Sequence, residues 1–485
     1  MPDEPQPQIP VETRTLTRPA ASTAASAPEA GSAPGSVPVS ASASGDSPAP
    51  GAALRYTRLL VIGIVLAALN LRPAITSLGA LLEEARDGLH MSGSVAGVLT
   101  SVPPLCFAVF GFTAPRLARR YGAGAIVCAG MVAITAGLLI RPFAGGTPAF
   151  LAASAFALMG IAVSNVLMPV IVKRYFPDRV GTMTGLYSMA LAFGTAVAAA
   201  ATVPMTEALG GSWRTGLGIW AVLAAVAVLP WLGLVRDRGA APPSGRKPSG
   251  RKPSGRELSG REPSGGAPAG SRPTGAPAAH GPATGQAPGL RLGRSRTAWA
   301  LACFFGLQAT GAYITMGWMP QVFRDAGVPA GTAGLLLAVT MVMGVPLAFV
   351  IPGLAARMRN QGPIVVGLGV CGLTAFSGLY FAPAGGAWLW AVLLGISNCS
   401  FPLALTMIGM RSRSGAGVVR LSAFAQSTGY LISIPGPLLV GVLYQHTGGW
   451  GLPIALMAGF LVPQMVAGVI AGQDRTIEDE ARMRD

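Results

Sequence analysis

Twelve long apolar stretches run through this chain of 485 residues, and they constrain its fold more than any other feature. We place them at 57–82, 93–114, 123–143, 148–172, 182–206, 214–235, 297–319, 331–354, 362–382, 387–410, 420–444 and 451–472. Each can cross a hydrocarbon layer, which takes roughly 20 helical residues. Only 11% of the residues are charged, against about 25% in soluble domains, which argues strongly against a soluble enzyme. The predicted fold is an all-α integral membrane protein.

Hydrophilic segments divide the chain into two halves. We predict two six-helix bundles at 55–235 and 297–472, with a C-tail at 473–485. Residues 1–54 are rich in Ala, Ser and Pro and are expected to form a disordered N-tail. Residues 236–296 hold a pentapeptide array from Ser244 (SGRKP, SGRKP, SGREL, SGREP), which predicts a flexible linker. A role of its basic residues at a lipid surface is the alternative.

The distribution of Lys and Arg residues predicts the orientation of the chain in the membrane. With both termini placed inside, inner segments hold 30 of the 35 basic residues. The outer loops hold four, namely Arg86, Arg141, Arg214 and Arg324. This bias predicts cytoplasmic termini. The Arg-, Ala- and Gly-rich composition suggests a bacterial chain in the cytoplasmic (plasma) membrane.

Composition also bears on cofactors and partners. The net charge of +16 is spread over loops and the linker, so nucleic-acid binding is not expected. All five cysteines fall in apolar stretches without metal-ligand spacing, and no P-loop or H-E-x-x-H motif occurs. We therefore expect no enzyme activity, no metal and no cofactor. The expected partners are the lipid bilayer and a small-molecule solute, with protons as a candidate coupling ion and a monomer as the functional state.

Two short patterns repeat between the halves. Residues 115–120 (PRLARR) follow the second span, and residues 352–357 (PGLAAR) follow the eighth. Asn165 with Pro169 in the fourth span corresponds to Asn398 with Pro402 in the tenth, 233 residues later. Such offsets indicate two halves related by duplication, which is typical of transporters with a site between the halves.

These features resemble the major facilitator superfamily. Its motif after the second span, G-x-L-A-D-R-x-G-R-R, is similar to residues 115–122 (PRLARRYG), although Arg119 stands at the Asp position. The resemblance implies the major facilitator fold, and it implies that this motif helps to latch the halves on the cytoplasmic side. The candidate gating residues are Pro73, Arg119, Arg120, Gly122 and Arg357.

A narrower resemblance rests on four segments, and it covers roughly 55–235 and 297–472. The segments are NLRPAITS at 70–77, LTSVP at 99–103, APRLARRYG at 114–122, and KRYFP at 173–177 leading to TGLY at 184–187. Together they resemble the cyanate permease and 2-nitroimidazole transporter (CynX/NimT) family. That resemblance implies transport of cyanate-like anions or small nitrogen heterocycles.

Arg72 is the most informative single residue. It lies about 20 Å along the first span, past the midplane, and an arginine within a span by default marks a solute or ion pathway. Snorkelling or a structural bond to a carbonyl is the alternative. Pro73 predicts a kink that releases the carbonyl of Leu69. Asn70 is placed to orient Arg72, and Thr76 shares its helix face.

Other polar residues in apolar spans are further candidates for solute binding. Asn165 and Asn398 occupy equivalent positions in the two halves, and interhelical hydrogen bonding is their alternative role. The remaining candidates are Tyr187, Gln308, Gln426 and Tyr430, of which the last two are four residues apart on one helix face. Each of these could equally be a packing residue.

The positions of the acidic residues indicate which type of solute is transported. None of the 19 Asp and Glu lies in the middle of a span, whereas proton-coupled exporters of cationic drugs commonly carry such carboxylates. We therefore predict a secondary active or facilitated transporter of a small polar or anionic solute, working by alternating access. The alternatives are a multidrug efflux transporter of the same fold and a membrane sensor or scaffold that does not transport.

Overall fold

The computed structural model describes residues 50–236 and 292–483, and all of them belong to one compact unit. The described residues contain helices and no strand, and twelve segments are long and apolar enough to cross a membrane. The predicted all-α fold with twelve transmembrane helices is confirmed. The predicted N-tail, up to residue 49, and nearly all of the predicted linker lie outside the described residues.

The first half of the described chain supplies six of these segments. Its helices are α1 (Pro50–Asn70), α2 (Pro73–Ala80), α3 (Leu82–Gly88), α4 (Gly93–Tyr121), α5 (Ala123–Ile140), η1 (Arg141–Phe143), α6 (Thr147–Tyr175), η2 (Pro177–Arg179), α7 (Val180–Ala208), α8 (Trp213–Gly218) and α9 (Trp220–Arg236). The first segment is broken between α1 and α2, and the sixth between α8 and α9.

The second half supplies the other six. Its helices are η3 (Leu292–Arg294), α10 (Arg296–Asp325), α11 (Ala330–Val342), α12 (Gly344–Arg357), α13 (Gly362–Phe381), α14 (Ala387–Ser397), α15 (Ser400–Met410), α16 (Gly415–Ser433), α17 (Pro435–Thr447), α18 (Gly451–Ala471) and α19 (Ile477–Arg482). Three of its segments are broken, namely the eighth, tenth and eleventh.

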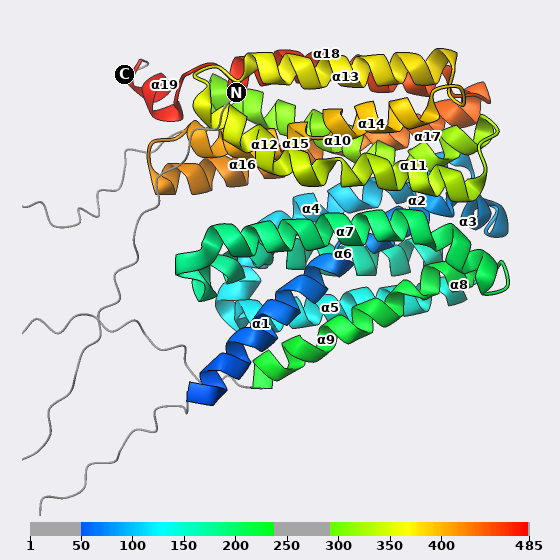
Figure 1. The fold of residues 1–485 in the computed structure, drawn as a ribbon, viewed down its shortest axis with the longest axis horizontal. Coiled ribbons are helices and arrows are strands. Elements are labelled where there is room, and N and C mark those ends of the chain that lie inside the picture. The colour runs from blue at the N-terminus through cyan, green and yellow to red at the C-terminus, as the bar shows by residue number, and fades with distance from the viewer. Residues whose placement is uncertain (1–49, 237–291, 484–485) are drawn as a thin grey trace, which may run out of the picture. The chain divides into compact units, whose positions relative to one another are not determined.

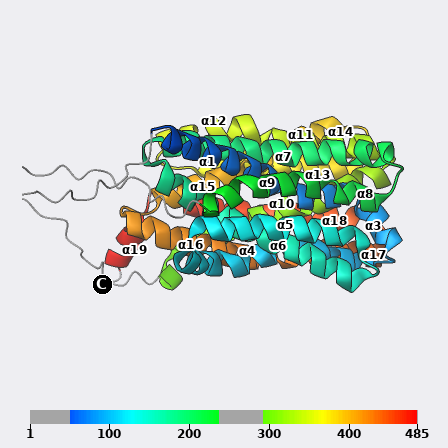
Figure 2. The same cartoon turned by 90° about the horizontal axis from the view of Figure 1, so that it is seen from below.

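The two halves lie side by side (Figure 1), with α2, α4 and α7 of the first against α10, α11, α16 and α17 of the second. Both views place α19 at one end of the bundle and α3 and α8 at the other (Figures 1 and 2). We call the end with α3 and α8 the outer end and the end with α19 the inner end, following the predicted orientation.

The C-tail contains an ordered helix at the inner end. Helix α19 begins with a capping box between Thr476 and Asp479, which satisfies the first backbone N–H groups of the helix. The buried carboxylate of Glu480 accepts hydrogen bonds from the hydroxyls of Ser295 (2.7 Å) and Thr297 (2.6 Å). The tail is therefore tied to the start of α10.

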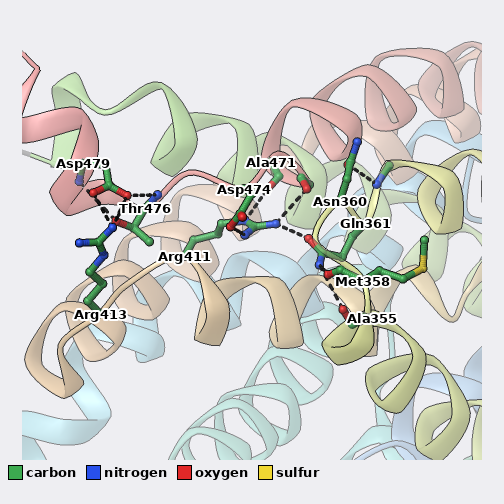
Figure 3. Close-up of polar contacts among 12 residues, drawn as sticks. Ala355, Met358, Asn360, Gln361, Arg411, Arg413, Ala471, Asp474, Thr476 and Asp479 are labelled. Atoms are coloured by element: carbon green, nitrogen blue, oxygen red, sulfur yellow. Dashed lines mark hydrogen bonds and ion pairs between the residues drawn. The ribbon is translucent and has the colours of Figure 1, made fainter.

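A buried arginine joins the neighbouring inner-end segments (Figure 3). The Nε of Arg411 donates to the carbonyl of Ala471 at 2.8 Å, and its Nη2 donates to Gly472 at 2.9 Å and to the side chain of Gln361. Burial lowers the pKa of Arg411, and the carboxylate of Asp474 opposes that effect. The guanidinium thereby connects the ends of α15 and α18 with the loop before α13.

Candidate functional site

The first membrane segment is interrupted at Leu71 and Arg72, between α1 and α2. Pro73, the first residue of α2, has no N–H to donate to the carbonyl of Leu69, so the α-helical ladder stops here. Gly194 of α7 packs directly against that carbonyl, in a space where a Cβ would not fit. The broken segment therefore follows from one proline and one close glycine contact, and it places Arg72 at the break.

Arg72 is half-buried and has no acidic partner. Its Nη1 lies 3.6 Å from the Sδ of Met316 in α10, which is a weak acceptor. Within the described part of the chain, no carboxylate lies within ion-pair distance of its guanidinium. A partly buried cation without a counter-charge is energetically unfavourable.

Thr76 stabilises the backbone at the break between α1 and α2. Its buried hydroxyl donates to the carbonyl of Arg72 at 3.2 Å, and the N–H groups of Ile75 and Thr76 also reach that carbonyl. These bonds fix the backbone from which the Arg72 side chain extends.

Aromatic side chains of the two halves also contact each other. The ring of Phe107 in α4 stacks on Tyr430 with centroids 5.0 Å apart, and it lies 6.4 Å from the ring of Tyr313. Residues of α4, α10 and α16 thus meet at the contact between the halves.

Two of the predicted residues contact each other. The hydroxyl of Tyr187 in α7 donates to the Oδ1 of Asn165 in α6, and both side chains are half-buried. This hydrogen bond ties α7 to α6.

Gln308 and Asn398 are also neighbours, because Pro402 leaves the backbone carbonyl of Asn398 without its usual helical donor. Pro402 cannot donate to the carbonyl of Asn398, and that carbonyl accepts from the backbone N–H of Phe401 at 3.1 Å and from the Nε2 of Gln308 at 3.2 Å. The Oε1 of Gln308 is buried and has no partner among the described residues. The equivalence of Asn165 and Asn398 is only partial, because α6 is continuous whereas the tenth segment breaks at Asn398.

Two predicted residues use their amides in local packing. The Nδ2 of Asn70 donates to the carbonyls of Leu66 (2.8 Å) and Leu223 (3.2 Å), which ties α1 to α9. The Nε2 of Gln426 donates to the hydroxyl of Ser422 at 2.7 Å, one turn earlier in α16. These bonds do not connect either amide to Arg72, so their role in solute binding stays a prediction.

The predicted gating residues after the second span lie at the inner end. Arg119 and Arg120 are exposed in the last turn of α4, and Gly122 ends that helix with a φ of 88°. Arg357 is the exposed last residue of α12. None of the three arginines forms an ion pair within the described ranges, so a latch at this motif stays a prediction.

At the outer end the halves are joined by specific polar contacts. Arg324 of α10 forms ion pairs of 2.9 Å with both Glu83 and Glu84 of α3. The Oε1 of Gln445 in α17 accepts from the backbone N–H (2.8 Å) and hydroxyl (2.7 Å) of Ser94 in α4. The ion pairs between described residues of the two halves all lie at this end, which indicates an arrangement closed on the outer side.

One residue assigned to an outer loop is in fact inside the helical bundle. Arg141 is only 1% exposed, because it begins η1 directly after α5 and donates from Nη1 to the carbonyl of Ala74 at 3.2 Å. The assignment of Arg141 to an outer loop is corrected to a buried 3-10 turn at the end of α5.

Comparison with known proteins identifies the family. The profile of the Major Facilitator Superfamily matches residues 59–414. The chain belongs to this superfamily. It is 32% identical to an uncharacterized transporter, YycB, of Bacillus subtilis (strain 168), over 88% of this chain and 96% of that protein. As a member of the Major Facilitator Superfamily, the chain is a multi-pass membrane transporter.

Two relatives from Escherichia coli (strain K12) are named for the solutes that they transport. The chain is 29% identical to the 2-nitroimidazole transporter, over 86% of this chain and 96% of that protein. It is 26% identical to the cyanate transport protein CynX, over 84% and 95%. The predicted resemblance to the CynX/NimT family is confirmed.

A solved structure shares the fold. The crystal structure of a bacterial homologue of the human lysosomal transporter Spinster aligns with a TM-score of 0.63 at 14% identity, covering 86% of this chain and 96% of that one. This similarity concerns the fold of the superfamily alone.

Several residues at this site are not among the sequence-based candidates. Met316 contacts Arg72, and Phe107 contacts Tyr313 and Tyr430, yet Met316, Phe107 and Tyr313 each sit in an apolar stretch as an ordinary apolar or aromatic residue. The Tyr313 hydroxyl could have been selected from the sequence on the same ground as Tyr430, as a polar group in an apolar span. Phe107 and Met316 have no such feature, because only the packing of the halves brings Met316 to Arg72 and Phe107 to Tyr430.

Proposed function

We propose that this transporter moves a small planar anion or polar solute, and that Arg72 binds it between the halves. The observation that carries the proposal is a half-buried guanidinium at a helix break that no described carboxylate neutralises. A planar guanidinium fork suits a small planar anion, with which it can form charge-assisted hydrogen bonds.

The surroundings of Arg72 support the same class of solute. The Tyr313 and Tyr430 side chains carry hydroxyls, and their contacts with the Phe107 ring supply flat apolar surface at the contact between the halves. A cyanate-like anion or a small nitrogen heterocycle matches this combination. Cyanate and 2-nitroimidazole are named for two relatives of the chain.

The mechanism we propose is alternating access. The solute binds at the contact between the halves, and its differential affinity for the two arrangements shifts the population between them. The ion pairs of Arg324 with Glu83 and Glu84 hold the outer end closed in one arrangement and separate in the other. We further propose that the protein lies in a bacterial cytoplasmic membrane with both termini inside, and that it works as a monomer. Protons are the coupling ion that we propose to test.

The direct test is uptake by proteoliposomes that contain the full-length chain. Labelled cyanate, labelled 2-nitroimidazole and the cationic dye ethidium are offered in turn, with and without an imposed pH gradient. Saturable uptake of cyanate or 2-nitroimidazole, without ethidium transport, is the expected result. Ethidium transport alone would favour multidrug efflux instead, and transport of none of the three by folded protein would contradict the proposed solute class.

A further inference from the structure

Among the side chains that the structure describes, the guanidinium of Arg72 has one hydrogen-bond partner, the thioether of Met316. The Nη1 of Arg72 lies 3.6 Å from the Sδ of Met316, which belongs to α10 in the other half. Arg72 is half-buried, whereas Met316 is only 3% exposed. A contact between the halves therefore forms at the same cation to which we assign solute binding.

Hydrogen bonds on both sides of Arg72 tie its backbone to the first half. Two residues before it, the Nδ2 of Asn70 donates to the carbonyl of Leu223 in α9 at 3.2 Å. Two residues after it, the carbonyl of Ala74 accepts from the Nη1 of the buried Arg141 at 3.2 Å. When the halves move relative to each other, Arg72 therefore moves with α9 and η1.

Met316 belongs to the second half, and α2 approaches it to backbone contact. Helix α10 packs on α16 and α18 of its own half. A Cβ on Gly79 of α2 would overlap the carbonyl of Met316, so only a glycine fits at this position. The next residue, Gly317, lies against the side chain of Thr100 in α4. This close approach brings the Met316 sulfur to Arg72, and the contact must break when α2 and α10 separate.

A thioether is a poor partner for a guanidinium. Its sulfur is a weak acceptor, whereas a hydrogen bond from a guanidinium to an anion is about twice as strong as one between neutral groups. The methionine side chain has several rotatable bonds and adapts readily to a changed neighbour. An anion that reaches Arg72 therefore gains more from the guanidinium than the sulfur of Met316 loses.

We propose that Met316 is a placeholder for the solute: its thioether occupies the guanidinium of Arg72 in the empty transporter, and the anion displaces it. Displacement removes a contact between the halves as the solute binds, which links solute occupancy to separation of α2 from α10. This inference rests on the proposed role of Arg72 in solute binding. Because the sulfur competes with the anion, its removal should strengthen anion binding, whereas loss of a residue that supports the site would weaken it.

Calorimetric titration of the purified full-length protein with sodium cyanate tests the competition, with sodium gluconate as the control for ionic strength. Met316→Leu keeps the volume and apolar character of the side chain but lacks the acceptor, so this variant should fold. It is expected to bind cyanate about threefold more tightly, because one weak hydrogen bond no longer competes. Met319→Leu is the matched control and should bind as the wild type does, because Met319 is also buried in α10 but is not the sulfur that Arg72 contacts.

NMR spectra of protein with isotope-labelled methionine methyl groups follow the contact itself. The Met316 signal is assigned by its absence from the spectrum of Met316→Leu. In the protein without cyanate, Arg72→Gln should shift this signal, because the neighbouring guanidinium is removed. Saturating cyanate should shift it in the wild type and leave it in place in Arg72→Gln. The Met319 signal should not move in either protein.

Two results would overturn the inference: a Met316 signal that does not respond to cyanate, or a cyanate affinity that is equal or weaker in Met316→Leu. Uptake of cyanate by proteoliposomes is measured separately. Uptake without a shift of the Met316 signal would leave the proposed function standing and remove the placeholder role. An Arg72-dependent shift in a protein that transports no cyanate, together with tighter binding by Met316→Leu, would contradict the proposed function and support the inference.

Discussion

Arg324 Nη1 lies 2.9 Å from Glu84 Oε1, and this ion pair joins α10 of one half to α3 of the other at the outer end. Glu83 adds a second carboxylate at the same distance from the guanidinium. All three side chains are partly exposed, so each pair contributes modestly to holding the outer end closed.

Substitution of both acids should release the outer end. We expect Glu83→Gln with Glu84→Gln to shift the equilibrium towards the outward-open arrangement by about 1 kcal/mol, or roughly fivefold. Spin labels at Ser212 and Ala384 in a cysteine-free background would report longer distances. Asp87→Asn is the control, because Asp87 pairs with Arg86 within α3. An unchanged distance distribution would show that these ion pairs do not hold the outer end.

The hydrogen bond from Tyr187 to Asn165 predicts coupled effects on transport. Tyr187→Phe and Asn165→Ala should each raise the half-saturation concentration for cyanate about fivefold, and the double variant should be no worse than either single one. A double-mutant cycle on uptake rates measures this coupling. Tyr380→Phe, at an exposed position, should have no effect. Additive losses would mean that the two side chains act independently.

The close contact of Gly194 with Leu69 predicts a sharp difference between two glycines of α7. Gly194→Ala should lower the free energy of unfolding by about 1–3 kcal/mol, because the new Cβ presses on the Leu69 carbonyl. Gly181→Ala has no heavy atom within 4 Å of its Cβ and should leave stability unchanged or slightly raised. Thermal unfolding in detergent compares the two. Equal stability would argue against tight packing at the helix break.

The C-tail predicts a pH-dependent contribution to stability. Burial raises the pKa of Glu480, but hydrogen bonds from Thr297 and Ser295 outweigh it and hold the pKa below the ordinary value of 4.5. The unfolded carboxyl therefore protonates first, and the stabilisation is complete above pH 4.5 and is lost as the pH falls through the lowered folded pKa.

Unfolding of the wild type and Glu480→Ala at pH 7 and at acid pH tests this contribution. The substitution should lower the free energy of unfolding by about 2 kcal/mol at pH 7 and by less at pH values below 4.5. Arg475→Ala, at an exposed position of the same tail, is the control. A difference that is constant across this pH range would contradict a role for the ionised carboxylate.

Local patterns in the sequence predicted the spans and the break at Pro73, because both depend on residues close together in the chain. Runs of apolar residues suffice to predict a membrane helix, and a proline removes one specific hydrogen bond. Arg72 was conspicuous for the same reason, as a charge within an apolar run. The repeat between the two halves of the sequence also identified Asn165 and Asn398 as candidates.

Contacts between distant segments could not be predicted in this way. Met316 lies beside Arg72 although the two are 244 residues apart, and the Glu84 to Arg324 pair spans 240 residues. Arg141 looked like a loop residue because a span end and a buried helix end have the same local sequence. The contacts of Glu480 could not be predicted either, because its partners, Ser295 and Thr297, are far away in the chain.

Uptake of labelled cyanate by proteoliposomes containing Arg72→Gln, Arg72→Lys or wild-type protein tests the central claim most directly. Arg359→Gln is the control, because Arg359 is an exposed arginine at the inner end. We predict saturable uptake by the wild type and Arg359→Gln, at least tenfold weaker uptake by Arg72→Lys, and none by folded Arg72→Gln, because a buried charged hydrogen bond is lost. Undiminished uptake by Arg72→Gln would contradict the claim that Arg72 binds the transported anion.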